Sequence, residues 1–115
     1  MYFNIDAKIF EQHPDLKIGV ILIKGINNAK RVSTVESLLR GICAQREKEV
    51  KGQDIFEHPA VKIWCHTYGR FGVNPKKYPP SIAALLKRVE KGRGLPHINV
   101  LVDLYNYFSL KYLLP

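Results

Sequence analysis

The fold class depends first on residues 16–23, which read LKIGVILI. Every second residue is apolar, so one face of this stretch carries Leu16, Ile18, Val20 and Leu22. The other face is also apolar, at Ile21 and Ile23. A strand that is apolar on both faces is typical of the interior of a sheet that is covered on each side. Residues 2–5 are a second, weaker strand candidate, and two strands are too few for a stable sheet. The sequence therefore predicts an α+β fold with a few-stranded sheet, whose remaining strands would lie outside these 115 residues.

Helices are predicted to pack with this sheet. Apolar spacing and stop signals indicate four of them, covering about residues 33–51, 59–71, 81–91 and 98–113. The first begins with Ser33 and Glu36, which match the Ser-x-x-Glu capping box. The fourth is apolar nearly all the way round, which predicts a buried helix. Together these elements predict a single domain spanning residues 1–115.

Composition narrows the class of protein. Apolar residues make up 46% of the chain and charged residues 24%, which is ordinary for a soluble globular protein. Cys43 and Cys65 follow no disulfide framework, the N-terminus does not resemble a secretory leader, and the longest apolar run is too short to span a bilayer. The expected location is therefore the cytoplasm, without a membrane partner.

Metal and cysteine chemistry are not predicted. The histidines are scattered, and neither cysteine has the spacing of a zinc site, so no metal is expected. Cys65 adjoins His66, but neighbours in a helix point about 100° apart and do not readily form a nucleophile–base pair. Cys65 is therefore interpreted as a packing residue.

Positive charge is concentrated between residues 62 and 93. This segment carries eight basic side chains and one acid, Glu90, in a chain of net charge +8. Charge gathered in this way favours a polyanionic partner, first of all a nucleic-acid backbone. The loop at residues 72–81 by itself also fits a solvated surface loop, but its paired lysines and aromatic ring suit phosphate contact and stacking. We therefore predict a set of residues that contact RNA or DNA, with Tyr78 for stacking or as a pocket wall and the others for phosphate: Arg70, Lys76, Lys77, Tyr78, Arg88 and Arg93.

A polar stripe on the fourth predicted helix is the second candidate site. Asn99, Asp103 and Asn106 stand four and three residues apart, so they share one face of a helix. A buried carboxylate is costly unless it is paired, so Asp103 needs a partner, either Arg88 or the backbone N–H groups of residues 93–97. Two interpretations stay open: a structural network that fixes how the helix docks, or the polar floor of a small-molecule or amino-acid pocket.

The order of these motifs resembles a known family. The resemblance rests on a string of short motifs: Phe71-Gly72, Pro75-Lys76-Lys77-Tyr78, Leu95-Pro96, Ile98-Asn99, Leu101-Val102-Asp103 and Tyr105-Asn106. The string resembles the tRNA-binding and editing domain of the bacterial phenylalanyl-tRNA synthetase beta subunit, the "B-three/B-four" domain. It resembles the free-standing proteins made of that domain even more closely. Relatives continue past the position of Pro115, so the chain is expected to correspond to an N-terminal half.

The resemblance implies an α+β fold, tRNA as the partner and hydrolysis of the ester of mischarged tRNA, with no cofactor. An aminoacyl ester is already activated, so a pocket that positions water and stabilises the oxyanion is sufficient, and no catalytic residue is assigned. Two alternatives stay open. One is a non-catalytic RNA-binding module. The other is a protein-interaction module, for example a homodimer formed through the unpaired edge of the predicted sheet.

Overall fold

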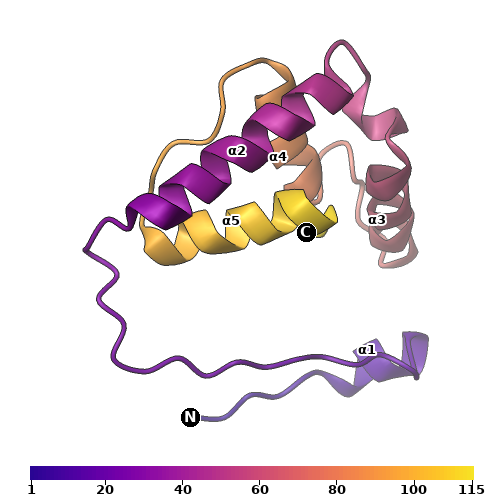
Figure 1. The fold of residues 1–115 in the computed structure, drawn as a ribbon. Coiled ribbons are helices and arrows are strands. Elements are labelled where there is room, and N and C mark those ends of the chain that lie inside the picture. Colours follow the sequence, from indigo (N-terminus) through magenta and orange to yellow (C-terminus); the bar gives the residue numbers. More distant parts are fainter.

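The computed structural model describes residues 1–115 and consists of helices joined by turns and extended segments. Five α-helices and one 3₁₀ turn follow one another along the chain: α1 (Ala7–Gln12), α2 (Ser33–Val50), η1 (Ile55–Glu57), α3 (Pro59–Arg70), α4 (Ser81–Glu90) and α5 (Val100–Tyr112). In Figure 1, α2, α4 and α5 form the centre of a helical body, and α3 lies at one end of it. Residues 1–32 run outside that body.

The predicted α+β fold is wrong, because the structure contains no strand. Residues 16–23 are extended, but they form no ladder with another segment and all of them are exposed. An extended segment becomes part of a sheet only when a neighbour takes its backbone N–H and C=O groups, and most of the remaining chain is helical. Without a sheet, the sheet edge expected to support a homodimer is also missing.

The four predicted helices, α2 to α5, are where the sequence predicts them, within a few residues, whereas α1 was not predicted. One start signal acts differently from the prediction. The predicted capping box does not form: Ser33 makes no capping hydrogen bond, and Glu36 is instead held by Arg31. A guanidinium offers the carboxylate two charge-assisted hydrogen bonds, which are stronger than a bond to one backbone N–H. Helix α3 begins as expected, with Pro59 in the first turn and the side chain of His58 accepting a hydrogen bond from Ala60 N.

The core lies between α2, α4 and α5. Helix α4 turns its apolar stripe inward, and Ile82, Leu86 and Val89 are almost completely buried. Each such side chain contributes about 1.5–3 kcal/mol through burial. The prediction of a fully buried α5 is wrong, because only Asp103 and Leu110 are buried there, while aromatic side chains such as Tyr105 stay exposed.

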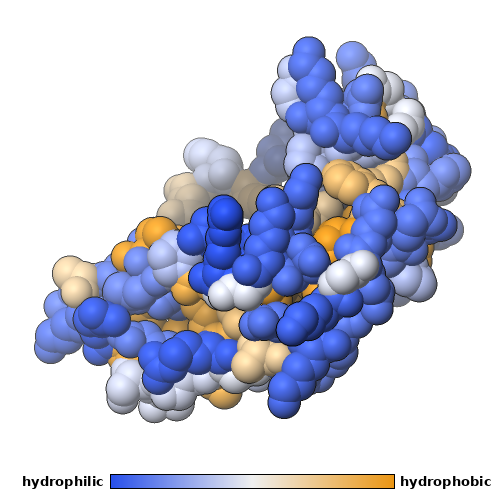
Figure 2. All heavy atoms as spheres, turned by 90° about the horizontal axis from the view of Figure 1, so that it is seen from above, coloured by the Kyte–Doolittle hydropathy of each residue, from blue (hydrophilic) through white to orange (hydrophobic).

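Few contacts tie residues 1–32 to the helical body. Asn28 Oδ1 accepts a hydrogen bond from Leu101 N at 3.0 Å, and the rings of His13 and Phe71 lie 5.5 Å apart. None of the helices has both the length and the apolar character needed to cross a bilayer. The face drawn in Figure 2 is mainly hydrophilic, with hydrophobic patches visible between the charged side chains.

Candidate nucleic-acid interface and the adjoining pocket

A groove of about 330 Å³ gathers positive charge on the exposed side of α4. Five basic side chains line it, no carboxylate does, and the rest of the lining is apolar. We call it the basic groove and define it by its basic residues: Lys76, Lys87, Arg88, Lys91 and Arg93.

Local structure brings these side chains together from three segments. Lys87 and Arg88 lie on α4, opposite its buried stripe. Gly92 adopts φ +67°, a left-handed conformation that suits glycine and lets the chain reverse after the helix. Arg88 Nε then donates a hydrogen bond to Gly94 O at 2.9 Å, which holds the returning turn, with Arg93 in it, beside α4.

The loop before α4 contributes Lys76. Asn74 Oδ1 accepts hydrogen bonds from Lys76 N at 2.9 Å and Lys77 N at 3.4 Å, and Asn74 O accepts one from Tyr78 N. Such local hydrogen bonds from an asparagine are typical of a stable turn. The loop therefore has a defined shape and presents its lysines to solvent.

Three of the six predicted RNA-contacting residues line the groove: Lys76, Arg88 and Arg93. The other three lie outside its lining. Lys77 Nζ lies 5.3 Å from the centre of the exposed Tyr78 ring, and Arg70 is exposed at the end of α3. The prediction omitted Lys87 and Lys91, although their spacing of four residues on one helix face marks them in the sequence.

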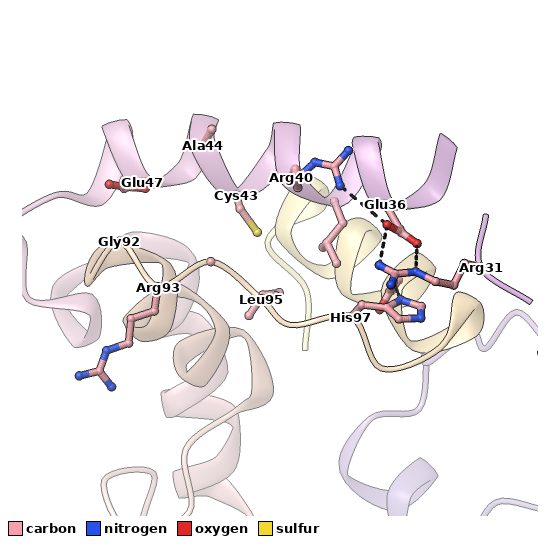
Figure 3. Close-up of a pocket in the computed structure, with 13 residues that line it drawn as sticks. Arg31, Glu36, Arg40, Cys43, Ala44, Glu47, Gly92, Arg93, Leu95 and His97 are labelled. Atoms are coloured by element: carbon pink, nitrogen blue, oxygen red, sulfur yellow. Dashed lines mark hydrogen bonds and ion pairs between the residues drawn. The ribbon is translucent and has the colours of Figure 1, made fainter. Parts of the chain in front are cut away.

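A second cavity, of about 510 Å³, lies between α2 and the segment that leads into α5. We call it the α2–α5 pocket; Figure 3 shows the residues that line it. Helix α2 supplies one wall, residues 92–97 supply the opposite wall, and Asp103 closes it from α5. Arg93 lines both this pocket and the basic groove, so the two sites adjoin.

Asp103 is the buried polar centre of this pocket, with 1% of its surface exposed. Its Oδ2 lies 2.5 Å from His97 Nδ1, and its Oδ1 accepts a hydrogen bond from Ile98 N at 3.1 Å. The expectation that a buried carboxylate must be paired is therefore met, but neither predicted partner supplies the contact. Arg88 is bonded to Gly94 O instead, and the backbone donor comes from Ile98, one residue beyond the predicted turn.

The predicted polar floor does not assemble as a set. Of its three members only Asp103 lines the pocket. Asn99 caps α5, since its Oδ1 accepts a hydrogen bond from Val102 N at 3.0 Å, and Asn106 is half-buried outside the lining. Sequence reasoning missed His97, because a residue that precedes a helix shares no helical face with Asp103.

Charge within the pocket is partly neutralised by an ion-pair cluster. Arg31 Nε lies 2.7 Å from Glu36 Oε1, and Arg40 Nη1 lies 3.8 Å from Glu36 Oε2. The hydrogen bond from Arg31 lowers the pKa of Glu36, so its carboxylate stays ionised. Burial raises the pKa of the Cys43 thiol, which leaves it a packing group rather than a nucleophile. No group of three or more metal-ligating side chains occurs in the structure.

Comparison with known protein families gives a match over the C-terminal part of the chain. Residues 63–115 match the family described as the B3/4 domain. The match confirms the predicted resemblance over that segment and is consistent with the B3/B4 domain of the phenylalanyl-tRNA synthetase beta subunit. The matched segment includes the five basic residues that define the basic groove, together with His97 and Asp103. Helix α2 lies before the matched segment. No curated protein and no solved structure matched the chain.

Proposed function

We propose that this chain binds tRNA through the basic groove, in the cytoplasm. The observation that carries the proposal is the convergence of five basic side chains, from a loop, a helix and a turn, on one groove that no carboxylate lines. Phosphate contacts supply most of the affinity of such a surface, because each neutralised phosphate releases condensed counterions. The B3/4 match over the same residues supports tRNA as the nucleic acid.

The flanking predicted residues extend this surface. Tyr78 is exposed and carries Lys77 over its ring, so a base could stack on the free face while the ammonium contacts a phosphate. Arg70 would contact a more distant part of the backbone. Stacking tolerates any base, so we expect the groove to recognise the shape and charge of tRNA more than its sequence.

Charge reversal within the groove tests the proposal. We expect Lys87→Glu/Lys91→Glu to weaken tRNA binding about 10-fold or more and to lower the slope of log Kd against log salt by about two, measured by fluorescence anisotropy. The matched control is Lys8→Glu/Lys17→Glu, which changes the net charge equally on exposed lysines outside the groove. Equal weakening by both pairs would mean that net charge alone causes the binding, and the proposal would be rejected.

Hydrolysis of mischarged aminoacyl-tRNA is a second candidate function. The specific observation in its favour is the α2–α5 pocket, which adjoins the basic groove through Arg93 and contains a buried carboxylate. The B3/4 match points the same way, since the resemblance implies editing. A panel of aminoacyl-tRNAs, one for each amino acid, distinguishes an enzyme from a non-catalytic RNA-binding module. If no ester is cleaved above the background rate, the enzymatic proposal is withdrawn and RNA binding remains.

A further inference from the structure

The pair formed by His97 and Asp103 has the geometry of a general base with its orienting carboxylate. Asp103 is almost fully buried, and its Oδ2 lies 2.5 Å from Nδ1 of His97, where a carboxylate oxygen accepts a hydrogen bond. The proton of the neutral imidazole is therefore placed on Nδ1, which leaves the lone pair on Nε2. His97 is partly exposed and lines the α2–α5 pocket, so its imidazole is accessible to a molecule inside the pocket.

We propose that His97 is the general base that activates water for ester hydrolysis in the α2–α5 pocket, and that Asp103 is its positioning residue. This inference rests on the proposed function, since it assigns a residue to the hydrolysis of aminoacyl-tRNA. The second hydrogen bond of Asp103, from Ile98 N, fixes the carboxylate itself, so the orientation of the imidazole is set by the start of α5.

The chemistry requires no further reactant. Nε2 of His97 takes a proton from water while the water oxygen bonds to the carbonyl carbon of the ester. The tetrahedral oxyanion then collapses, the bond between the carbonyl carbon and the ribose oxygen breaks, and the imidazolium returns the proton to that oxygen. The products are a free carboxylic acid and a free hydroxyl, and His97 is regenerated.

The surroundings of His97 are suited to this role. Figure 3 shows Arg31, Glu36 and His97 gathered at one end of the pocket, with Arg40 above them. The guanidinium groups of Arg31 and Arg40 balance the carboxylates of Glu36 and Asp103 at this end, and a guanidinium there can donate hydrogen bonds to a developing oxyanion. Arg40 is well exposed and held at 3.8 Å by Glu36, so it is free to turn toward a bound carbonyl group.

The position of Arg93 suggests a path by which the end of an RNA would reach His97, the proposed general base. It lines the basic groove and the α2–α5 pocket, and Figure 3 shows its side chain directed away from His97. A backbone gripped along the groove would meet Arg93 where the two sites join. The terminal ester would then lie in the pocket, on the His97 side.

The decisive variant is His97→Asn, in the full 115-residue chain. The amide nitrogen of asparagine replaces Nδ1, so Asp103 keeps its hydrogen-bond partner, but nothing replaces Nε2. We expect kcat for the aminoacyl-tRNA that the wild type cleaves fastest to fall about 100- to 10,000-fold. The Kd for uncharged tRNA should stay within about twofold. His66→Asn, at an exposed position on α3 outside the pocket, is the matched control and should leave both values unchanged.

Asp103→Asn tests whether Asp103 positions His97. The readout is the pH profile of hydrolysis, which a purely structural role of Asp103 would not change. The charged and titratable groups that face His97 are Asp103 from α5, Arg31 from the preceding segment, and Glu36 and Arg40 from α2. With the carboxylate replaced by an amide, we expect kcat to fall about 10-fold or more at unchanged KM, and the acidic limb of the pH profile to move. Circular dichroism establishes that each variant is folded.

The outcomes separate this inference from the proposed function. Loss of hydrolysis with retained tRNA binding in His97→Asn supports it. Full hydrolysis by that variant overturns the assignment of His97 and leaves the editing proposal standing. Binding of tRNA without cleavage of any ester in the panel overturns the inference and leaves the RNA-binding proposal. Absence of tRNA binding by the wild type rejects the proposed function itself, and the inference with it.

Discussion

Residues 1–32 and residues 33–115 both contain many apolar side chains, but only the second region buries a set of them as a core. In the helical body, apolar side chains recur every three or four residues, so each helix needs cover on one side and finds it on a neighbour. Residues 16–23 are apolar on both faces, so they need cover on both sides and a strand at each edge. The difference shows that burial depends on whether the chain contains a matching partner, not on how apolar a segment is.

The largest expected effect on stability comes from a matched pair of Leu→Ala substitutions, one in each region. Leu86 is fully buried against the core, so Leu86→Ala should lower the free energy of unfolding by about 2–5 kcal/mol, through lost burial and a residual cavity. Leu22 is exposed, so Leu22→Ala should change it by less than about 0.5 kcal/mol. Urea denaturation followed by circular dichroism measures both values. A large loss at Leu22 would show that residues 16–23 are packed in solution, against a second copy or the helical body.

A polar contact between α2 and α5 should have the next largest effect. Arg46 donates hydrogen bonds to Leu110 O and Lys111 O, both at 2.8 Å, and so caps the end of α5. Its side chain is mostly buried, so Arg46→Ala leaves two carbonyl groups without this donor and should cost about 1.5–3 kcal/mol. Arg40→Ala, on the exposed side of the same helix, should cost less than about 1 kcal/mol. Similar losses from the two substitutions would contradict the contact.

The same comparison explains how much of the structure the sequence predicts. The helices follow from local rules, such as Pro59 at the start of α3 and the apolar stripe of α4, and those rules do not depend on distant residues. The prediction of a sheet was wrong. Residues 16–23 have the local sequence pattern of a strand, but a strand also needs a second segment to pair with, and local pattern does not reveal one. Local rules also misplaced Glu36, whose carboxylate binds Arg31 rather than the backbone of its own helix.

The candidate sites also differ in how far local sequence predicts them. The basic groove could be predicted in part, because most of its cations lie close together in the sequence, on α4 and the segments beside it. The contact between His97 and Asp103 could not, since it depends on the path of the chain into α5. The adjoining position of groove and pocket depends on the packing of α4 against α2, which no spacing in the sequence reveals.

Asn28 marks the point where the two regions meet, and its removal should have a smaller effect. Its side chain accepts a hydrogen bond from Leu101 N in the first turn of α5, next to the cap that Asn99 supplies to Val102 N. Asn28→Ala should cost about 0.5–2 kcal/mol and speed amide hydrogen exchange at Leu101. Asn4→Ala, whose side chain bonds only the adjacent backbone, is the control and should change neither quantity. Unchanged exchange at Leu101 would mean that residues 1–32 are not anchored at this point.

The smallest expected effect concerns the ion pair between Arg31, at the end of the first region, and Glu36, at the start of the second. Arg31 lowers the pKa of Glu36 below its ordinary value. The folded state therefore binds fewer protons than the unfolded state, so this pair stabilises the fold above the unfolded pKa, and the contribution is lost as pH falls through the folded pKa. Arg31→Ala should raise the pKa of Glu36, measured by carboxyl NMR titration. Glu49 is an internal reference, since Gln45 and Arg46 lower its pKa and Arg31 does not. If the pKa of Glu36 did not move, the link between the two regions would have to be carried by Asn28 rather than by charge.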